Sequence, residues 1–114
     1  MSDPVTVERD GHVLLIGVNR PAKRNAFDLA VIEALAAAYE ALGTDGELRA
    51  AVLFGHGDHF SAGLDLAQVG PEVARHGPGV LAGSHRFDPF ALWADPVPKP
   101  VVLAVNGISA ACGP

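Results

Sequence analysis

The fold of this chain is decided by residues 52–66, which read VLFGHGDHFSAGLDL. The apolar run Ala50–Phe54 is typical of a short buried strand, and the glycines around His56 indicate where that strand stops. A compact turn follows, in which Asp65 is expected to cap a short helix behind it. Glycine-rich turns that follow buried strands can leave backbone N–H groups unpaired, so this stretch predicts a place where negative charge could be stabilised.

Upstream of this stretch, the sequence predicts a β-hairpin. Val5–Arg9 alternates apolar and polar residues, as a half-buried strand does. Asp10-Gly11 is a signal for a type I′ turn. The nearly continuous apolar run Val13–Val18 suits a strand that is covered on both faces.

A helix is expected between this hairpin and the buried strand. Asp28 is a suitable N-cap, Leu42 is the last apolar residue of the helical pattern, and Gly43 is a natural terminator. The apolar residues at helical spacing are Leu29, Ile32, Leu35, Ala36, Tyr39 and Leu42. Residues 19–25, which precede the helix, are expected to form a polar loop.

The remainder of the chain adds one strand. Residues 70–98 are rich in glycine, proline and histidine, and predict no firm element beyond a turn or two of helix around Phe90–Trp93. The apolar run Val101–Val105 predicts a fourth strand that ends at Asn106. The order strand, strand, helix, strand, loop, strand indicates the α/β class. Because the chain stops on a glycine-rich turn soon after this strand, we expect it to be truncated after its fourth recognisable strand.

Composition and charge exclude several classes of protein. The chain has 114 residues, 49% of them hydrophobic and 18% charged, which is typical of one folded domain or part of one. A net charge of −5 without a block of like charge argues against nucleic acid or a membrane as the main partner. The single cysteine, Cys112, allows neither an internal disulfide nor a cysteine-based zinc cluster. With no signal-peptide pattern and no long apolar run, a cytoplasmic location is expected.

Three segments of the chain resemble the crotonase family, the enoyl-CoA hydratases and isomerases. They read NRPAKRNAF at residues 19–27, VLFGHGDHFSAGLDL at residues 52–66, and KPVVLAVNG at residues 99–107. Each is moderately specific, and their order and spacing strengthen the match. The resemblance implies a crotonase-like spiral of ββα units, of which residues 1–114 are the N-terminal portion of a single domain whose C-terminal half is absent.

The resemblance also implies a chemistry, that of acyl-CoA thioesters. Removing a proton beside a thioester carbonyl, or adding to the conjugated double bond, places negative charge on the carbonyl oxygen. Two fixed backbone N–H groups stabilise that oxyanion strongly in a dry site. Carried over from the family, the donors are the N–H groups of Leu64 and Cys112, or of Gly113 if the count from Asn106 is shifted by one residue.

Contacts with coenzyme A are implied in the same way. Arg24 and Ala26 are expected to line one side of the bound coenzyme, with Arg24 placed to meet a phosphate. The other side is expected to consist of Ala62, Gly63, Leu64, Asp65 and Leu66. Coenzyme A enters as part of the substrate, so neither a separate cofactor nor a metal is implied. Relatives form trimers and dimers of trimers, and the complete protein is expected to do the same. The family's catalytic glutamates would lie beyond Pro114, so this chain alone is expected to be inactive.

A metal site and a thiol nucleophile also stay open. His56, Asp58 and His59 could suggest a metal site, although a tight turn makes it hard for all three to converge. Cys112 could be a nucleophile with His85 as its base, although a small buried cysteine is far commoner.

The role of the whole chain, and of its exposed groups, is open as well. The chain could be a catalytically inactive crotonase-fold fragment that binds coenzyme A or assembles with relatives. Arg24 could be a solvated loop charge, and Asp65 could be a general base rather than a cap. Phe87, Phe90 and Trp93 could line an acyl pocket or only cover the core.

Overall fold

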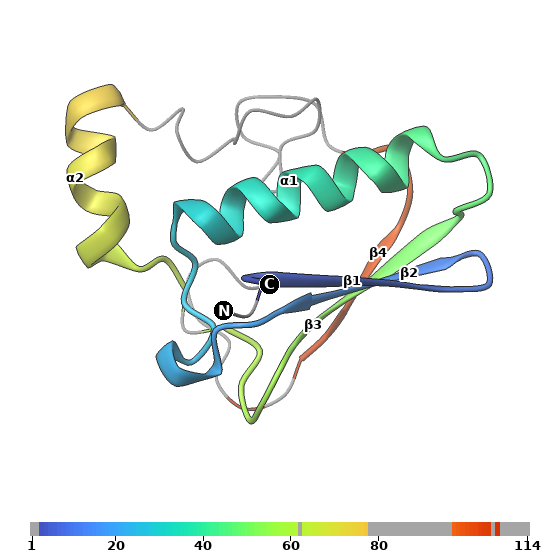
Figure 1. Cartoon of the computed structure of the whole chain (residues 1–114), viewed down its shortest axis with the longest axis horizontal. Coiled ribbons are helices and arrows are strands. Elements are labelled where there is room, and N and C mark those ends of the chain that lie inside the picture. The colour runs from blue at the N-terminus through green and yellow to red at the C-terminus, as the bar shows by residue number, and fades with distance from the viewer. Residues whose placement is uncertain (1–2, 62, 78–96, 106, 108–114) are drawn as a thin grey trace.

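The computed structural model describes residues 3–61, 63–77, 97–105 and 107 (Figure 1). In chain order, the elements are β1 (Val5–Asp10), β2 (Val13–Val18), the 3-10 helix η1 (Pro21–Lys23), α1 (Leu29–Thr44), β3 (Ala50–Gly55), α2 (Leu66–His76) and β4 (Val101–Ala104). The strands form one sheet in the order β1-β2-β3-β4, antiparallel between β1 and β2 and parallel elsewhere. The α/β class is therefore confirmed.

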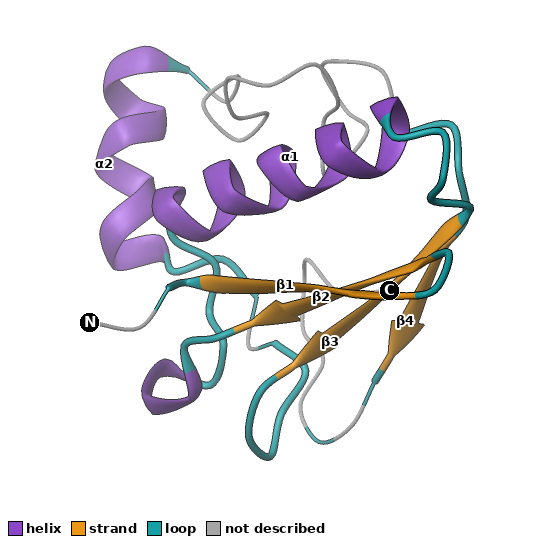
Figure 2. Ribbon diagram, turned by 45° about the vertical axis from the view of Figure 1, so that its right-hand side comes forward, coloured by secondary structure: helices purple, strands orange, loops and turns teal. Residues whose placement is uncertain are grey.

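The core lies between α1 and one face of this sheet (Figure 2). The apolar stripe of α1 is buried there as predicted, and the strands contribute side chains that share this face in register. Leu14, Ile16 and Val18 of β2 are buried, beside Ala51 and Leu53 of β3. The opposite face is covered only in part, because Val13 and Leu15 of β2 are half-buried and Val102 of β4 is 59% exposed. The expectation that β2 is covered on both faces thus holds in full only at Gly17, and in part at Val13 and Leu15.

The hairpin is present, but its turn differs from the prediction. Asp10 pairs with Val13, so β1 is one residue longer than expected and the two-residue loop consists of Gly11 and His12. Gly11 has a φ of 61°, whereas His12 does not have a positive φ. A type I′ turn requires positive φ at both central residues, so the predicted turn type is wrong.

Helix α1 begins as predicted and ends later. Asp28 is its N-cap and accepts a hydrogen bond from the Val31 N–H at 2.9 Å. Gly43 lies inside the helix, which continues to Thr44, so the predicted terminator is wrong. The physical reason lies far away in the sequence. The Lys99 ammonium donates to the carbonyl oxygens of Leu42, Asp45 and Leu48, each at 2.7 Å, and so pairs carbonyls of the last helical turn and of the connection that follows it.

Helix α2 corrects a second prediction, since it runs through Gly70 and Pro71, where no firm element was expected. It lies beside the N-terminal end of α1 (Figure 1). Asp65 is its N-cap, as predicted, and Gly77 with a φ of 82° is its C-cap. Proline inside a helix removes one backbone hydrogen bond. Val69, which is 1% exposed, anchors the helix in spite of that loss. The predicted helical turn around residues 90–93, and the aromatic residues there, lie outside the described residues.

Candidate functional site

The three sequence segments meet where the parallel strands end. β2 and β3 lead into residues 19–27 and 56–65, and these two loops are joined by a parallel bridge between Phe27 and Leu64. The end of β4 also reaches this place. A Cβ added to Gly107 would lie 2.2 Å from the Asp58 carbonyl oxygen and 2.5 Å from His59 Nδ1, so only a glycine allows this approach.

The bridge fixes the direction of one backbone N–H group. Phe27 N–H donates to the Gly63 carbonyl at 2.7 Å, and Asp65 N–H donates to the Phe27 carbonyl at 2.8 Å. Because Phe27 bonds to the residues on either side of Leu64, the N–H of Leu64 points away from it. Gly63 N–H is occupied by Ser61 Oγ at 3.0 Å. Leu64 N–H lies between two hydrogen-bonded neighbours, and no described residue accepts a hydrogen bond from it.

Asn25 holds the turn from the inside, since it is completely buried and all its side-chain groups are paired. Its Nδ2 donates to the carbonyls of His56 at 2.8 Å and His59 at 2.7 Å, and its Oδ1 accepts from the Arg20 N–H at 2.8 Å. Its carbonyl accepts from Ser61 Oγ at 2.9 Å, the same hydroxyl that accepts from Gly63 N–H. The φ of Asn25 is 55°, a left-handed conformation in which asparagine is better tolerated than most residues.

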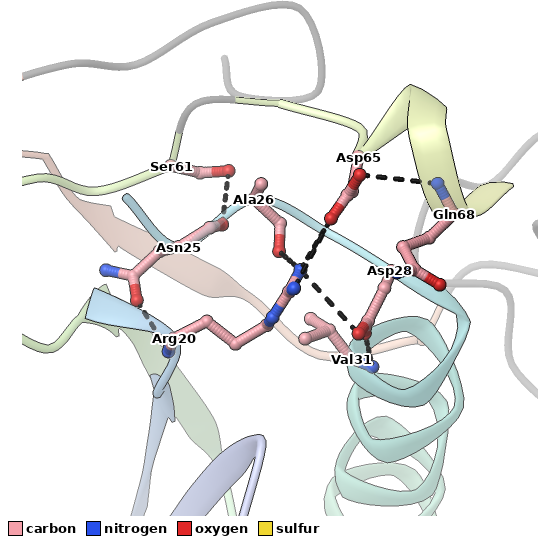
Figure 3. Close-up of polar contacts among 8 residues, drawn as sticks. All are labelled: Arg20, Asn25, Ala26, Asp28, Val31, Ser61, Asp65 and Gln68. Atoms are coloured by element: carbon pink, nitrogen blue, oxygen red, sulfur yellow. Dashed lines mark hydrogen bonds and ion pairs between the residues drawn. The ribbon is translucent and has the colours of Figure 1, made fainter. Parts of the chain in front are cut away.

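A second support comes from the Arg20 side chain (Figure 3). Its guanidinium donates to the Ala26 carbonyl at 2.7 Å and to Asp65 Oδ2 at 3.3 Å, and lies 3.6 Å from Asp28 Oδ2. The other oxygen of each aspartate caps a helix, since Asp28 Oδ1 accepts from α1 and Asp65 Oδ1 from the Gln68 N–H of α2. One guanidinium thus joins the N-caps of both helices to the loop that precedes α1.

Sequence reasoning missed both Arg20 and Asn25, although it singled out Arg24 in the same loop. The available signal was indirect. Two N-cap aspartates were expected, and each cap uses one carboxylate oxygen, which leaves the second oxygen of each in need of a cation.

Arg24 lies on the outside of this loop. It is exposed, has a φ of 51°, and ends η1 by donating its backbone N–H to the Pro21 carbonyl. Its guanidinium forms no hydrogen bond or ion pair with a described residue, in contrast to that of Arg20. Ala26, the other residue predicted on this side of the ligand, is half-buried, and its carbonyl is occupied by Arg20.

The remaining predicted site residues divide into two groups. Asp65 is a cap, as expected, and both of its carboxylate oxygens are engaged. The backbone of Leu66 begins α2. Ala62, His85, Cys112 and Gly113 lie outside the described residues, so the second predicted donor and the thiol nucleophile stay predictions.

The metal hypothesis finds no support in the part of the chain that the structure describes. No group of three or more histidine, cysteine, aspartate or glutamate residues there could hold a metal ion. His56 Nε2 instead lies 2.7 Å from Thr6 Oγ1. Within the same residues, no helix is both long and apolar enough to cross a membrane.

Comparison with known proteins points to one family. The model of the enoyl-CoA hydratase/isomerase family matches residues 8–114. The chain is 34% identical to the enoyl-CoA hydratase EchA19 of Mycobacterium tuberculosis over 94% of its own length and 40% of that protein. It is 32% identical to the mitochondrial Delta(3,5)-Delta(2,4)-dienoyl-CoA isomerase of Rattus norvegicus, over 84% of this chain and 32% of that protein.

Solved structures agree with these relatives. The crystal structure of a probable enoyl-CoA hydratase/isomerase from Mycobacterium abscessus matches with a TM-score of 0.78 and 45% identity, over 90% of this chain and 39% of that one. An enoyl-CoA hydratase from Mycobacterium tuberculosis matches with a TM-score of 0.73 and 34% identity, over 93% and 39% of the two chains. The chain therefore spans about 40% of the length of EchA19 and 39% of each of these two solved chains.

Proposed function

The chain belongs to the enoyl-CoA hydratase/isomerase family, and we propose that it forms one wall of an acyl-CoA site in which backbone N–H groups stabilise a thioester enolate. The proposed donors are the N–H groups of Leu64 and Cys112, with Gly113 as the alternative to Cys112. Coenzyme A would be held by Arg24, Ala26 and residues 62–66. In this proposal the chain is the N-terminal portion of one crotonase-like domain.

One observation carries the proposal, namely that the Leu64 N–H, between two hydrogen-bonded neighbours, has no acceptor in the part of the chain that the structure describes. A donor that stabilises an oxyanion must be unpaired in the empty site, and its direction must be fixed before the charge develops. The bonds of Gly63 and Asp65 fix the backbone on either side, so the Leu64 N–H meets both requirements. Such a donor stabilises the transition state most when the backbone around it does not have to move during the reaction.

Arg24 supports the coenzyme A part of the proposal. Its exposed guanidinium has no ion pair with a described residue, and Lys23 beside it is exposed as well. A phosphate could therefore pair with Arg24 without displacing an existing partner. In a chain with a net charge of −5, this local pair of cations is what an anionic ligand requires.

A second candidate, binding of coenzyme A or assembly with relatives without turnover, is favoured by the state of the neighbouring carboxylates. Asp28 and Asp65 each cap a helix with one oxygen and face Arg20 with the other. Neither is free to move a proton to or from a substrate. Hydration of crotonyl-CoA by the complete protein would favour the first candidate over the second. The first candidate function also includes a cytoplasmic location and assembly into trimers or hexamers, as expected for the complete protein.

The test uses the 114-residue chain, labelled with ¹⁵N and titrated in parallel with acetyl-CoA and free coenzyme A. Free coenzyme A lacks the thioester carbonyl, so the Leu64 amide resonance should shift downfield with acetyl-CoA only. Arg24→Ala should weaken binding of both ligands by about tenfold, as expected for a lost charge-assisted contact. Binding of acetyl-CoA without a Leu64 shift would refute the donor assignment, and absence of binding by either ligand would refute the site.

A further inference from the structure

The loop of residues 20–25 holds the Leu64 turn from both sides. On the N-terminal side, Asn25 binds Ser61, whose hydroxyl accepts from the Gly63 N–H. On the C-terminal side, Arg20 binds Asp65, whose N–H is bonded to Phe27. Arg20 takes part on both sides, because its own N–H is the donor to Asn25 Oδ1.

Charge makes Arg20 the critical member of this arrangement. Its side chain is 18% exposed, and those of Asp28 and Asp65 are 23% and 17% exposed, so the three charges are only partly screened by solvent. One cation and two carboxylates leave one net negative charge. This charge faces the N-termini of α1 and α2, each of which carries an effective charge of roughly +0.5. Without Arg20, the two carboxylates would repel each other, and α2 would lose its link to α1.

We propose that Arg20 is a positioning residue for the oxyanion donor: through Asp65 it sets the direction of the Leu64 N–H, and it never contacts the ligand. The proposal rests on the function proposed above for Leu64. It gives the two arginines of one loop different roles, since Arg24 faces outward to a phosphate while Arg20 faces inward to the Leu64 turn. Arg20 therefore affects recognition of the thioester carbonyl, and Arg24 affects recognition of the coenzyme.

Amide hydrogen exchange tests the positioning without any ligand. In Arg20→Gln, protection of the Asp65 amide, which donates to Phe27, should fall about tenfold or more, because the charge-assisted contacts to Asp65 are lost. Protection of the Ile16 amide, in the buried part of β2, should change much less. Arg20→Lys keeps the charge but cannot reach Ala26 and Asp65 together, so it should restore protection only in part.

Arg9→Gln is the matched control, because it also removes an arginine that is paired with an aspartate, Asp45. This pair lies at the hairpin end of the sheet and is more exposed, so the Asp65 amide should keep its protection within about fivefold. If Arg20→Gln lowers protection of Asp65 and Ile16 by the same factor, or of neither, the proposal is overturned.

Ligand affinity separates a positioning role from a merely structural one. Arg20→Gln should weaken the affinity for acetyl-CoA by about tenfold and that for free coenzyme A by clearly less, since both ligands contact residues 62–66 but only acetyl-CoA has the thioester carbonyl that the Leu64 N–H would bind. An equal loss of affinity for acetyl-CoA and for free coenzyme A would overturn the proposal. If the wild-type chain binds neither ligand, the proposed function fails, and the exchange result still decides whether Arg20 orders the turn.

Should Arg20→Gln not fold, Asp65→Asn replaces it. Asparagine still caps α2 but gives up the charge that faces Arg20. The exchange of the Phe27 amide, which donates to Gly63, then reports on the turn. Unchanged protection of Phe27 in Asp65→Asn would overturn the proposal.

Discussion

Asn25→Ala should cost the chain a large part of its stability, and the structure sets the magnitude. The substitution removes the side chain that pairs the Arg20 N–H and the carbonyls of His56 and His59, in a site where Asn25 is fully buried. Each buried group left unpaired costs about 1–3 kcal/mol. Alanine must also adopt a φ of 55°, which adds roughly 1–2 kcal/mol. Because Arg20, His56 and His59 are only half-buried, the lower ends of these ranges apply, and the expected loss is about 4–5 kcal/mol, comparable to the total stability of many domains.

Two matched variants separate these contributions. Asn25→Gly loses the same hydrogen bonds but accepts a positive φ freely, so it should be more stable than Asn25→Ala by about 1 kcal/mol. Arg24→Gly relieves a φ of 51° and removes no side-chain contact with a described residue, so its stability should stay within about 1 kcal/mol of wild type.

Urea unfolding followed by far-ultraviolet circular dichroism measures the free energy of unfolding of all three variants. Loss of stability should be largest for Asn25→Ala, smaller for Asn25→Gly and absent for Arg24→Gly. If Asn25→Ala unfolds within about 1 kcal/mol of wild type, the Asn25 network does not hold the turn, and the argument built on it is wrong.

Two further predictions follow from single buried or half-buried groups. Lys99→Met leaves three carbonyls without their shared donor and should destabilise the chain by about 2–4 kcal/mol in urea unfolding, whereas Lys23→Met, at an exposed position, should have little effect. Burial raises the pKa of Tyr39 to about 12, so the unfolded state loses its proton at a lower pH than the folded state, and stability should fall by about 2 kcal/mol between pH 10 and 12. Tyr39→Phe should not show this fall when the free energy of unfolding is measured against pH. An identical alkaline profile for the variant would contradict the raised pKa of Tyr39.

Local patterns predicted those parts of the fold that depend on local physics. Strand alternation and helical periodicity report which side of an element is apolar, and they located the hairpin, α1, β3 and β4. Asp28 and Asp65 were recognised as caps because capping is a contact within one turn of helix. For α2, the basic residues of its last turn and Gly77 after it were usable signals, and Gly70 and Pro71 outweighed them.

Features that depend on distant partners could not be predicted in this way. Nothing near Gly43 indicates that Lys99 pairs the carbonyls at the end of α1, 51 to 57 residues away along the chain. The candidate site shows the same division. Leu64 and Arg24 were predicted through family resemblance, whereas Arg20 and Asn25, which contact the segment around Leu64, were missed because their partners lie in other segments.

The contact made by Lys99 has a consequence for the chain as it emerges from the ribosome. The last carbonyl that its ammonium binds, that of Leu48, precedes it by 51 residues. At a synthesis rate of roughly 5–20 residues per second, about 3–10 s pass between the two. For that interval, the C-terminal turn of α1 and the connection to β3 lack their shared donor. We therefore expect the C-terminal turn of the nascent helix to fray until the segment leading into β4 arrives.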